Sequence, residues 1–243
     1  RIGEALWLSP LKSLPDPPFA PLKGFASLCF GKARTGMRVL WILGGSSRTD
    51  QFTNATWRSD NGGSTWEKVL SKPKWSPRSR LGVAAGSTFP DPFPKAIMYV
   101  LGGQSSAGLC SDVWASDNLC RSWHLMNESA PFGARIDVAC STVPGNPGCI
   151  VVGGGISSDL HRDVWISHDI GEHFQQIDMP ELPPFATLLQ WPPDILCAAK
   201  ASHGNQVHLW QMKLTESGNS EGAEIATLES LDEFADVTWW GVR

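Results

Sequence analysis

A stretch with the same internal landmarks occurs three times in this chain and constrains the fold more than any other feature. Each copy has an apolar run that ends in glycines, then an aromatic residue, then a second aromatic residue nine positions later. The first aromatics are Trp57, Trp114 and Trp165, which lie 57 and then 51 residues apart. A period near fifty with several short strands per repeat predicts a β-propeller, in which each repeat forms one blade.

The third copy shows why the repeat predicts strands. Cys149–Val152 is a short, wholly apolar and mostly β-branched run, which is typical of a strand buried on both faces. Asp163–Ser167 alternates polar and apolar residues, which indicates a strand with one packed face. A tight turn then leads from Ser167 to Phe174 and into a third strand.

We therefore expect an all-β chain, a single propeller domain over residues 1–243 with four-stranded antiparallel blades. The expected blades cover about 24–71, 78–127, 133–178 and 185–229, with terminal strands over 5–9 and 234–242. Proline-rich linkers separate the blades, and the fourth blade lacks both the glycines and the turn. Four blades are few, because propellers have roughly four to eight. Either the two ends combine in a partial further blade or the chain is part of a larger wheel.

Two features of the repeat resemble known families. A di-glycine after an apolar strand, followed by an aromatic about twelve residues on, resembles the kelch repeat. The segment Ser167–Phe174 (SHDIGEHF) resembles the Asp-box, or BNR, turn of sialidases and related propellers. The resemblance covers residues 24–178 well and the rest weakly. It implies a structural turn, since both motifs occur in proteins with unrelated activities.

The residues of the Asp-box pattern occur in all three copies, with two departures. Asn61 and Asn118 occupy the aspartate position, and Cys120 replaces the glycine of the second copy. In such a turn the Asp or Asn side chain accepts backbone N–H bonds and the glycine adopts a positive φ. The expected turn residues are Ser59, Asn61, Gly63 and Trp66, then Ser116, Asn118 and Trp123, then Ser167, Asp169, Gly171 and Phe174.

Charge and hydropathy exclude some classes of partner. The net charge is −4 without a basic run, which argues against nucleic acid as the main partner. No segment approaches eighteen uninterrupted apolar residues, so no membrane span is expected. The sequence begins without Met or a signal-like stretch, and we expect a mature or trimmed form.

Six cysteines and two glycosylation sequons favour a secreted protein or one in an organelle lumen. The expected disulfide is Cys140–Cys149, across a hairpin, and Cys110–Cys120 and Cys29–Cys197 are further possible pairs. The alternative is a set of free, buried thiols that pack as small hydrophobic groups. The sequons are Asn54-Ala-Thr56 and Asn127-Glu-Ser129.

No residue pattern indicates an enzyme, a cofactor or a metal site. A sialidase requires an arginine cluster and a Tyr–Glu pair, as that resemblance implies, and the one tyrosine, Tyr99, lies in a buried type of strand. Copper-radical chemistry on a kelch wheel would need tyrosine ligands that this chain lacks. His161, His168 and His173 lie near one blade turn without a diagnostic metal-ligand spacing, so we expect loop histidines.

Two functional hypotheses follow. The first is a non-catalytic scaffold or accessory subunit of a larger assembly whose partner is another protein. The second is a glycan-binding or degenerate sialidase-like module, for which exposed tryptophans would stack on sugar rings. Trp75 and Trp191, in or beside linkers, are the candidates for that role.

Overall fold

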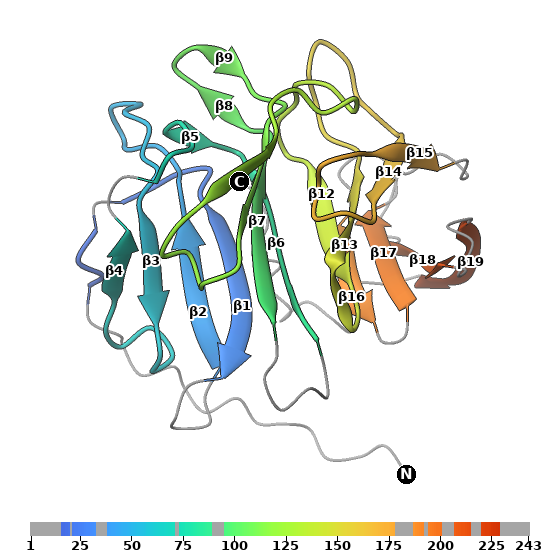
Figure 1. The fold of residues 1–243 in the computed structure, drawn as a ribbon, viewed down its shortest axis with the longest axis horizontal. Coiled ribbons are helices and arrows are strands. Elements are labelled where there is room, and N and C mark those ends of the chain that lie inside the picture. Colours follow the sequence, from blue (N-terminus) through green and yellow to red (C-terminus); the bar gives the residue numbers. More distant parts are fainter. Residues whose placement is uncertain are drawn as a thin grey trace.

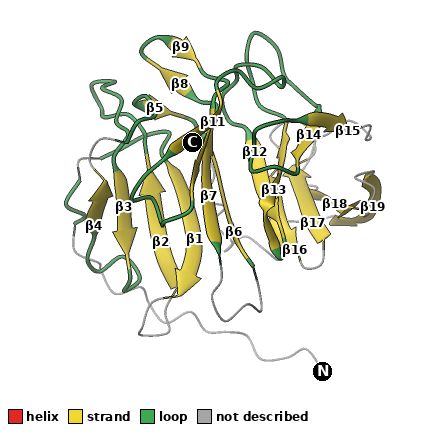
Figure 2. Ribbon diagram, in the orientation of Figure 1, coloured by secondary structure: helices red, strands yellow, loops and turns green. Residues whose placement is uncertain are grey.

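The computed structural model describes most of the chain, and the fold in these residues is entirely β (Figures 1 and 2). The expected terminal strands, 5–9 and 234–242, lie outside the described residues. No helix of the described part is long and apolar enough to cross a membrane. The described residues are 16–19, 21–32, 38–70, 73–88, 95–177, 187–191, 194–200, 207–214 and 220–228.

The described residues form four antiparallel four-stranded sheets, one after another along the sequence. The first sheet has the order β1-β2-β3-β4, with bounds Ala26–Lys32, Arg38–Leu43, Thr56–Ser59 and Glu67–Leu70. The second has the order β6-β7-β10-β11, with bounds Gly82–Ser87, Ala96–Leu101, Val113–Ser116 and His124–Asn127.

The third and fourth sheets repeat this simple order. The third sheet contains β12 to β15, with bounds Ala139–Val143, Asn146–Gly153, Val164–Ser167 and Gln175–Ile177. The fourth contains β16 to β19, with bounds Thr187–Trp191, Asp194–Lys200, Val207–Leu214 and Ser220–Leu228. The prediction of antiparallel four-stranded sheets is confirmed.

The three repeats superpose at the level of strand register. Trp57, Trp114 and Trp165 occupy the second position of the third strand in each sheet and pair with Ile42, Val100 and Val152. This confirms the equivalence that the constant spacing of the aromatics predicts. One detail differs from the prediction, because a small sheet, β5-β8-β9 (Arg78–Ser79, Gln104–Ser105, Gly108–Leu109), was not expected.

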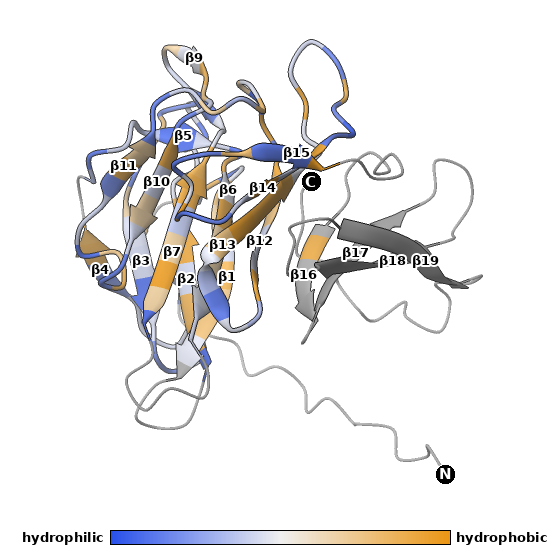
Figure 3. Ribbon diagram, turned by 45° about the vertical axis from the view of Figure 1, so that its right-hand side comes forward, coloured by the Kyte–Doolittle hydropathy of each residue, from blue (hydrophilic) through white to orange (hydrophobic). Residues whose placement is uncertain are grey.

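The sheets pack face to face in chain order, and the core lies between them. Strands β1, β6, β12 and β16 neighbour one another in succession (Figure 1). One cluster joins the first two sheets through Trp41, Met98 and Trp123, and another joins the second and third through Tyr99 and Ile150. A third cluster reaches the fourth sheet. Strands β7 and β13 supply buried residues to both of their faces. Figure 3 shows the hydrophobic colour along β7.

Candidate functional site

Each of the first three sheets has two repeated polar assemblies, one at each end of its strands. The first surrounds the di-glycine at the end of the second strand. Gly45 N donates to Arg78 O at 2.8 Å, and Gly103 N donates to Arg135 O at 2.9 Å. A Cβ on Gly44 would lie 2.8 Å from Arg78 O, and one on Gly102 would lie 2.8 Å from Arg135 O. The glycines are therefore required because the chain that enters the next sheet passes against them.

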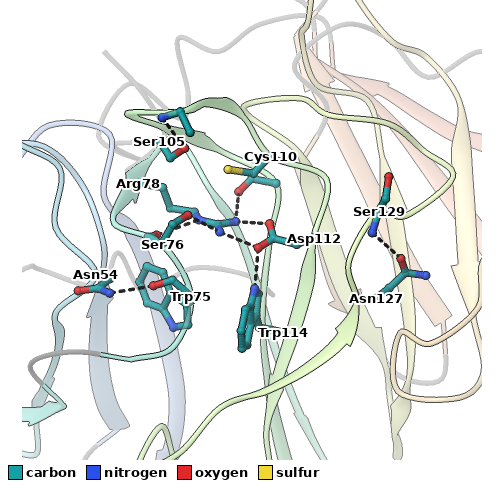
Figure 4. A network of polar contacts seen from close by, with 12 residues as sticks. Asn54, Trp75, Ser76, Arg78, Ser105, Cys110, Asp112, Trp114, Asn127 and Ser129 are labelled. Atoms are coloured by element: carbon teal, nitrogen blue, oxygen red, sulfur yellow. Dashed lines mark hydrogen bonds and ion pairs between the residues drawn. The ribbon is translucent and has the colours of Figure 1, made fainter.

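A buried ion pair lies beside the di-glycine of the second sheet (Figure 4). The Arg78 guanidinium donates to both carboxylate oxygens of Asp112, at 2.5 and 2.7 Å, and to Gly102 O at 2.9 Å. Trp114 Nε1 donates to the same carboxylate at 2.6 Å. Burial raises the pKa of Asp112, but the bonds from Arg78 and their charge outweigh it and hold that pKa below its usual value.

The third sheet has the same arrangement. Arg135 donates to both oxygens of Asp163, at 2.6 and 3.1 Å, and to Gly154 O at 3.0 Å. Trp165 Nε1 donates to Asp163 at 2.7 Å. The side chains of Arg78 and Arg135 are only 1% and 2% exposed, so both charges depend on their carboxylates for compensation.

Sequence reasoning missed these two clusters, although a signal for them exists. The tripeptide Asp-Val-Trp occurs at 112–114 and again at 163–165. In both places the aspartate follows the di-glycine and directly precedes the third strand. An aspartate repeated at a position that enters a buried strand indicates a buried cationic partner.

Three residues with a left-handed backbone conformation connect the first three sheets at the di-glycine end of their strands. Gly24, Arg80 and Asp137 have φ values of 59°, 54° and 53°. Arg80 N donates to Gly24 O at 2.6 Å, and Asp137 N donates to Arg80 O at 3.0 Å. The Arg80 side chain also pairs with the Asp137 carboxylate, which raises the pKa of Arg80. Backbone bonds thus run from the first sheet to the second and from the second to the third.

The second assembly is the predicted turn between the third and fourth strands. Ser167 Oγ donates to Asp169 Oδ1 at 2.8 Å and accepts from Gly171 N at 2.9 Å. Asp169 Oδ1 also accepts from His173 N at 2.9 Å. Gly171 has a φ of 89°, as the pattern requires. A Cβ at Gly171 would lie 2.8 Å from a side-chain atom of Val113, so the glycine also lets the second sheet approach.

The other two copies form the same turn with asparagine. Gly63 N donates to Ser59 Oγ at 2.8 Å, and Thr65 N donates to Asn61 Oδ1 at 2.9 Å. In the second sheet Cys120 N donates to Ser116 Oγ at 2.9 Å, and Ser122 N donates to Asn118 Oδ1 at 2.9 Å. Cys120 adopts a φ of 63°, so the turn persists although a cysteine replaces the glycine.

The last aromatic of each turn packs on a ring from a linker. Trp123 makes an edge contact with Trp75 at 6.1 Å between centroids, and Phe174 contacts Phe132 at 5.2 Å. Trp66 contacts Phe19 at 5.5 Å. Trp75 is fully buried, so it does not supply the exposed sugar-stacking ring for which it was a candidate under the glycan-binding alternative. The side chain of Trp191 lies outside the described residues.

The three neighbouring histidines are not brought together. His161 Nε2 bonds Ser157 Oγ at 2.7 Å, while His168 Nδ1 contacts Cys149 Sγ at 3.5 Å. His173 Nδ1 pairs with Asp169 Oδ2 at 2.7 Å. Asp169, Glu172 and His173 offer ligand atoms within 4.8 Å of one another and could hold a cation in an exposed position.

Asp169 and His173 shift each other's pKa. Burial raises the pKa of Asp169, but the bonds from His173 and Ser167 together outweigh it and lower that pKa to about 2. The bond from Asp169 raises the pKa of His173.

The predicted disulfides Cys140–Cys149 and Cys110–Cys120 are wrong, because all four of these cysteines are free in the structure. The register explains the first case. Cys140 pairs with Val152 and packs between the second and third sheets, whereas Cys149 packs with Val151 on the opposite face. Burial raises the pKa of Cys140 to about 12 and that of Cys149 to about 11, so both thiols are protonated hydrophobic groups. Cys29 is also free, and the side chain of Cys197 is not described.

Both sequon asparagines use their side-chain nitrogens in structural bonds. Asn54 Nδ2 donates to Pro73 O at 3.1 Å and to Trp75 O at 2.8 Å, which fixes a linker. Asn127 Nδ2 donates to Glu172 O at 2.7 Å. The glycan would attach to this nitrogen, so the folded chain does not present either asparagine freely.

Comparison with known proteins identifies the fold alone. No family model matches the sequence. No curated protein matches it either. Among the solved structures 157 chains match, including the structure of YjhT, with a TM-score of 0.57 and 16% sequence identity. The match covers 89% of this chain and 68% of YjhT. The chain therefore shares the overall fold of YjhT.

Proposed function

We propose that this protein is a non-catalytic β-propeller module of the kelch and Asp-box type that binds another protein. The strand order, the face-to-face packing of successive sheets and the repeated turns support the proposal that each sheet is a blade. A module of this kind would serve as a scaffold or accessory subunit, and its partner is a protein.

The observation that supports a non-catalytic role is how the repeated charged groups are used. Within the described residues, the buried arginines Arg78 and Arg135 each donate to a carboxylate and to a backbone carbonyl. A neighbouring tryptophan donates to the same carboxylate in both places. The Asp169 carboxylate is used to close a turn. Each of these groups is bonded to other parts of the fold, whereas a catalytic acid or base needs a proton-transfer partner in a substrate.

The loops that follow the di-glycines provide a surface for a protein partner. Gln104 pairs with Leu109 and Ile156 pairs with Leu160, so the two leucines end equivalent loops at one end of the sheets (Figure 1). They are 39% and 47% exposed. Large apolar side chains exposed on neighbouring loops are typical of protein interaction sites.

The test compares leucines of equal exposure in different places. The double variant Leu109→Asp/Leu160→Asp changes the di-glycine loops, and Leu125→Asp changes the edge strand β11, where Leu125 is 46% exposed. Tagged wild-type protein should co-purify with a stoichiometric partner from its source. We expect that partner to be lost with the double variant and kept with Leu125→Asp. Equal recovery with all three proteins would contradict this interaction surface.

A further inference from the structure

Strand β1 and the residue directly before it expose side chains whose equivalents in the next two sheets are packed. Phe25, Leu81 and Val138 occupy equivalent positions in the first three sheets. Each lies three residues after another set of equivalent residues, which are Leu22, Arg78 and Arg135 in the same order. Leu81 and Val138 are each 7% exposed, whereas Phe25 is 38% exposed. The difference arises because the di-glycines of the preceding sheets, at Gly44 and Gly102, cover Leu81 and Val138.

Two further positions on β1 show the same difference. Ser27 and Cys29 are exposed, but their equivalents in the second sheet, Val83 and Ala85, pack against the first sheet. In the third sheet the equivalent of Cys29 is Thr142, whose Oγ1 donates to Ala85 O at 3.0 Å. Phe25, directly before β1, and Ser27 and Cys29 within it thus form a free face, termed the free face on β1, at the place where a preceding sheet would lie.

Backbone groups beside this free face also lack the partners that their equivalents have. The carbonyls of Arg78 and Arg135 accept from the second glycine of the preceding sheet, and the equivalent carbonyl is that of Leu22. The N–H groups of Arg80 and Asp137 donate to the preceding sheet, and the equivalent N–H is that of Gly24. Among the described residues no backbone bond is made by Leu22 O or Gly24 N. The missing partner would present a glycine N–H and a carbonyl oxygen, as Gly45 and Gly24 do for the second sheet.

The remaining residues of this chain are too few to supply that partner. The first sheet with its connections uses 45 residues, from Ala26 to Leu70. The longest stretches outside the described residues, 1–15 and 229–243, have 15 residues each. The fourth sheet packs against the third through β12 and β16. The fold of YjhT extends beyond this chain, which covers 68% of it.

We propose that the free face on β1 docks a four-stranded antiparallel sheet from outside residues 1–243, whose second strand ends in Gly-Gly. The docked sheet would bury Phe25 and Cys29, donate a glycine N–H to Leu22 O and accept from Gly24 N. This inference rests on the proposed function because it specifies one protein partner of the module. It concerns a different surface from the loop leucines, so the two can fail separately.

The test supplies such a sheet and measures the reactivity of Cys29. A second copy of residues 22–77, with its own Cys29 changed to Ser, is inserted between Pro21 and Leu22 of the full chain. In the native chain Gly44–Gly45 lies against Arg78–Arg80. In the extended chain the Gly44–Gly45 of the inserted copy would lie in the same way against the original Leu22–Gly24. Maleimide labelling of the native thiols, followed by peptide mapping, gives the rate at each cysteine.

We expect labelling of the original Cys29 to be at least about tenfold slower in the extended chain than in the native one. The rate at Cys110, on a loop of the second sheet, should not change. A matched control has the two glycines of the inserted copy changed to Ala, and Cys29 should stay reactive there because a Cβ cannot approach the entering backbone.

Three results would overturn the proposal. The first is an unchanged Cys29 rate in the extended chain, whether or not the inserted copy resists protease. The second is a Cys29 that is already protected in the native chain while it is monomeric, since its own residues would then cover the face. The third is a native chain that elutes as a dimer and becomes a monomer with Phe25→Asp, since a second copy would then be the occupant.

Discussion

The first sheet and the third sheet have the same strand order, but they fill the position beside the di-glycine differently. In the third sheet Arg135 and Asp163 form a buried ion pair there. In the first sheet the equivalent positions are Leu22 and Ala55, as the matching bonds Gly44 N to Ala55 O and Gly154 N to Asp163 O show. Both charges are replaced together, and the sheet still forms.

This comparison indicates that the ion pair is one of two solutions for the same site. A buried ion pair is often no more stabilising than well-packed apolar residues, because burial removes the solvation of both charges. Removing only one partner is much more damaging, since the remaining charge is buried without compensation. A change at such a site is therefore expected to be tolerated when both residues are replaced, as in the first sheet, and not when only one is.

The largest expected effect comes from splitting the pair. We expect Arg135→Leu to lower the free energy of unfolding by about 3–5 kcal/mol, because the Asp163 carboxylate loses its cation. The double variant Arg135→Leu/Asp163→Ala, which copies the first sheet, should recover most of that loss. Urea unfolding of both variants measures the effect. A double variant as unstable as the single one would show that the two sites are not interchangeable.

The next effect concerns the close approach of successive sheets at the di-glycine. We expect Gly102→Ala to cost about 1–3 kcal/mol through crowding. Its Cβ would lie 2.8 Å from Arg135 O in the neighbouring sheet. Gly108→Ala is the control, because Gly108 also has a positive φ but a Cβ there would meet nothing within 4 Å. Thermal unfolding of the pair separates crowding from backbone strain, and equal losses would exclude crowding as the reason for the glycine.

A smaller effect compares the aspartate turn with the two asparagine turns. We expect Asp169→Ala to cost about 1–2 kcal/mol, because the backbone N–H of His173 and the Ser167 hydroxyl lose their acceptor. Asp169→Asn should be nearly neutral, since Asn61 and Asn118 close the same turn. Urea unfolding of both variants is the measurement. A large loss with Asp169→Asn would show that the negative charge itself is required.

The smallest effect is the pH dependence of that turn. The pKa of Asp169 is lowered to about 2, so its contribution is present above its unfolded pKa of about 3.9 and is lost as pH falls toward 2. The pKa of His173 is raised, so its contribution is present below about pH 6.5 and is lost as pH rises through the folded pKa.

The difference in Tm between wild type and Asp169→Asn should therefore be largest between about pH 4 and pH 6.5. His173→Asn should remove only the decrease at the alkaline end. A difference in Tm that stays constant across this pH range would show that the Asp169–His173 pair contributes no charge-dependent stability.

The sequence was enough to locate most strands and all three turns. The predicted strands Cys149–Val152 and Asp163–Ser167 fall on β13 and β14, because the first is an apolar run that ends at glycines and the second alternates polar and apolar residues. The turns were predictable because their bonds join residues two to four positions apart, such as Ser167 to Asp169 and Gly171. Local bonds of this kind depend on local residues alone.

The cysteine pairings could not be predicted in the same way. Cys140 and Cys149 flank one hairpin, but a bulge between Thr142 and Val143 shifts the register and places them on opposite faces of the sheet. One position of register is enough to reverse which face a side chain occupies. Sequence spacing without the register therefore gave the wrong pairing.

The repeat by itself determined the all-β class, the period of the sheets and the turn that closes each one, because these depend on contacts within about fifty residues. Only the tertiary structure showed that Arg78 meets Asp112 and that Arg135 meets Asp163, 34 and 28 residues apart. It alone showed that Phe25 is exposed where Leu81 and Val138 are buried. The physical reason is that burial and ion pairing in these sheets depend on the neighbouring sheet, whose position no single repeat encodes.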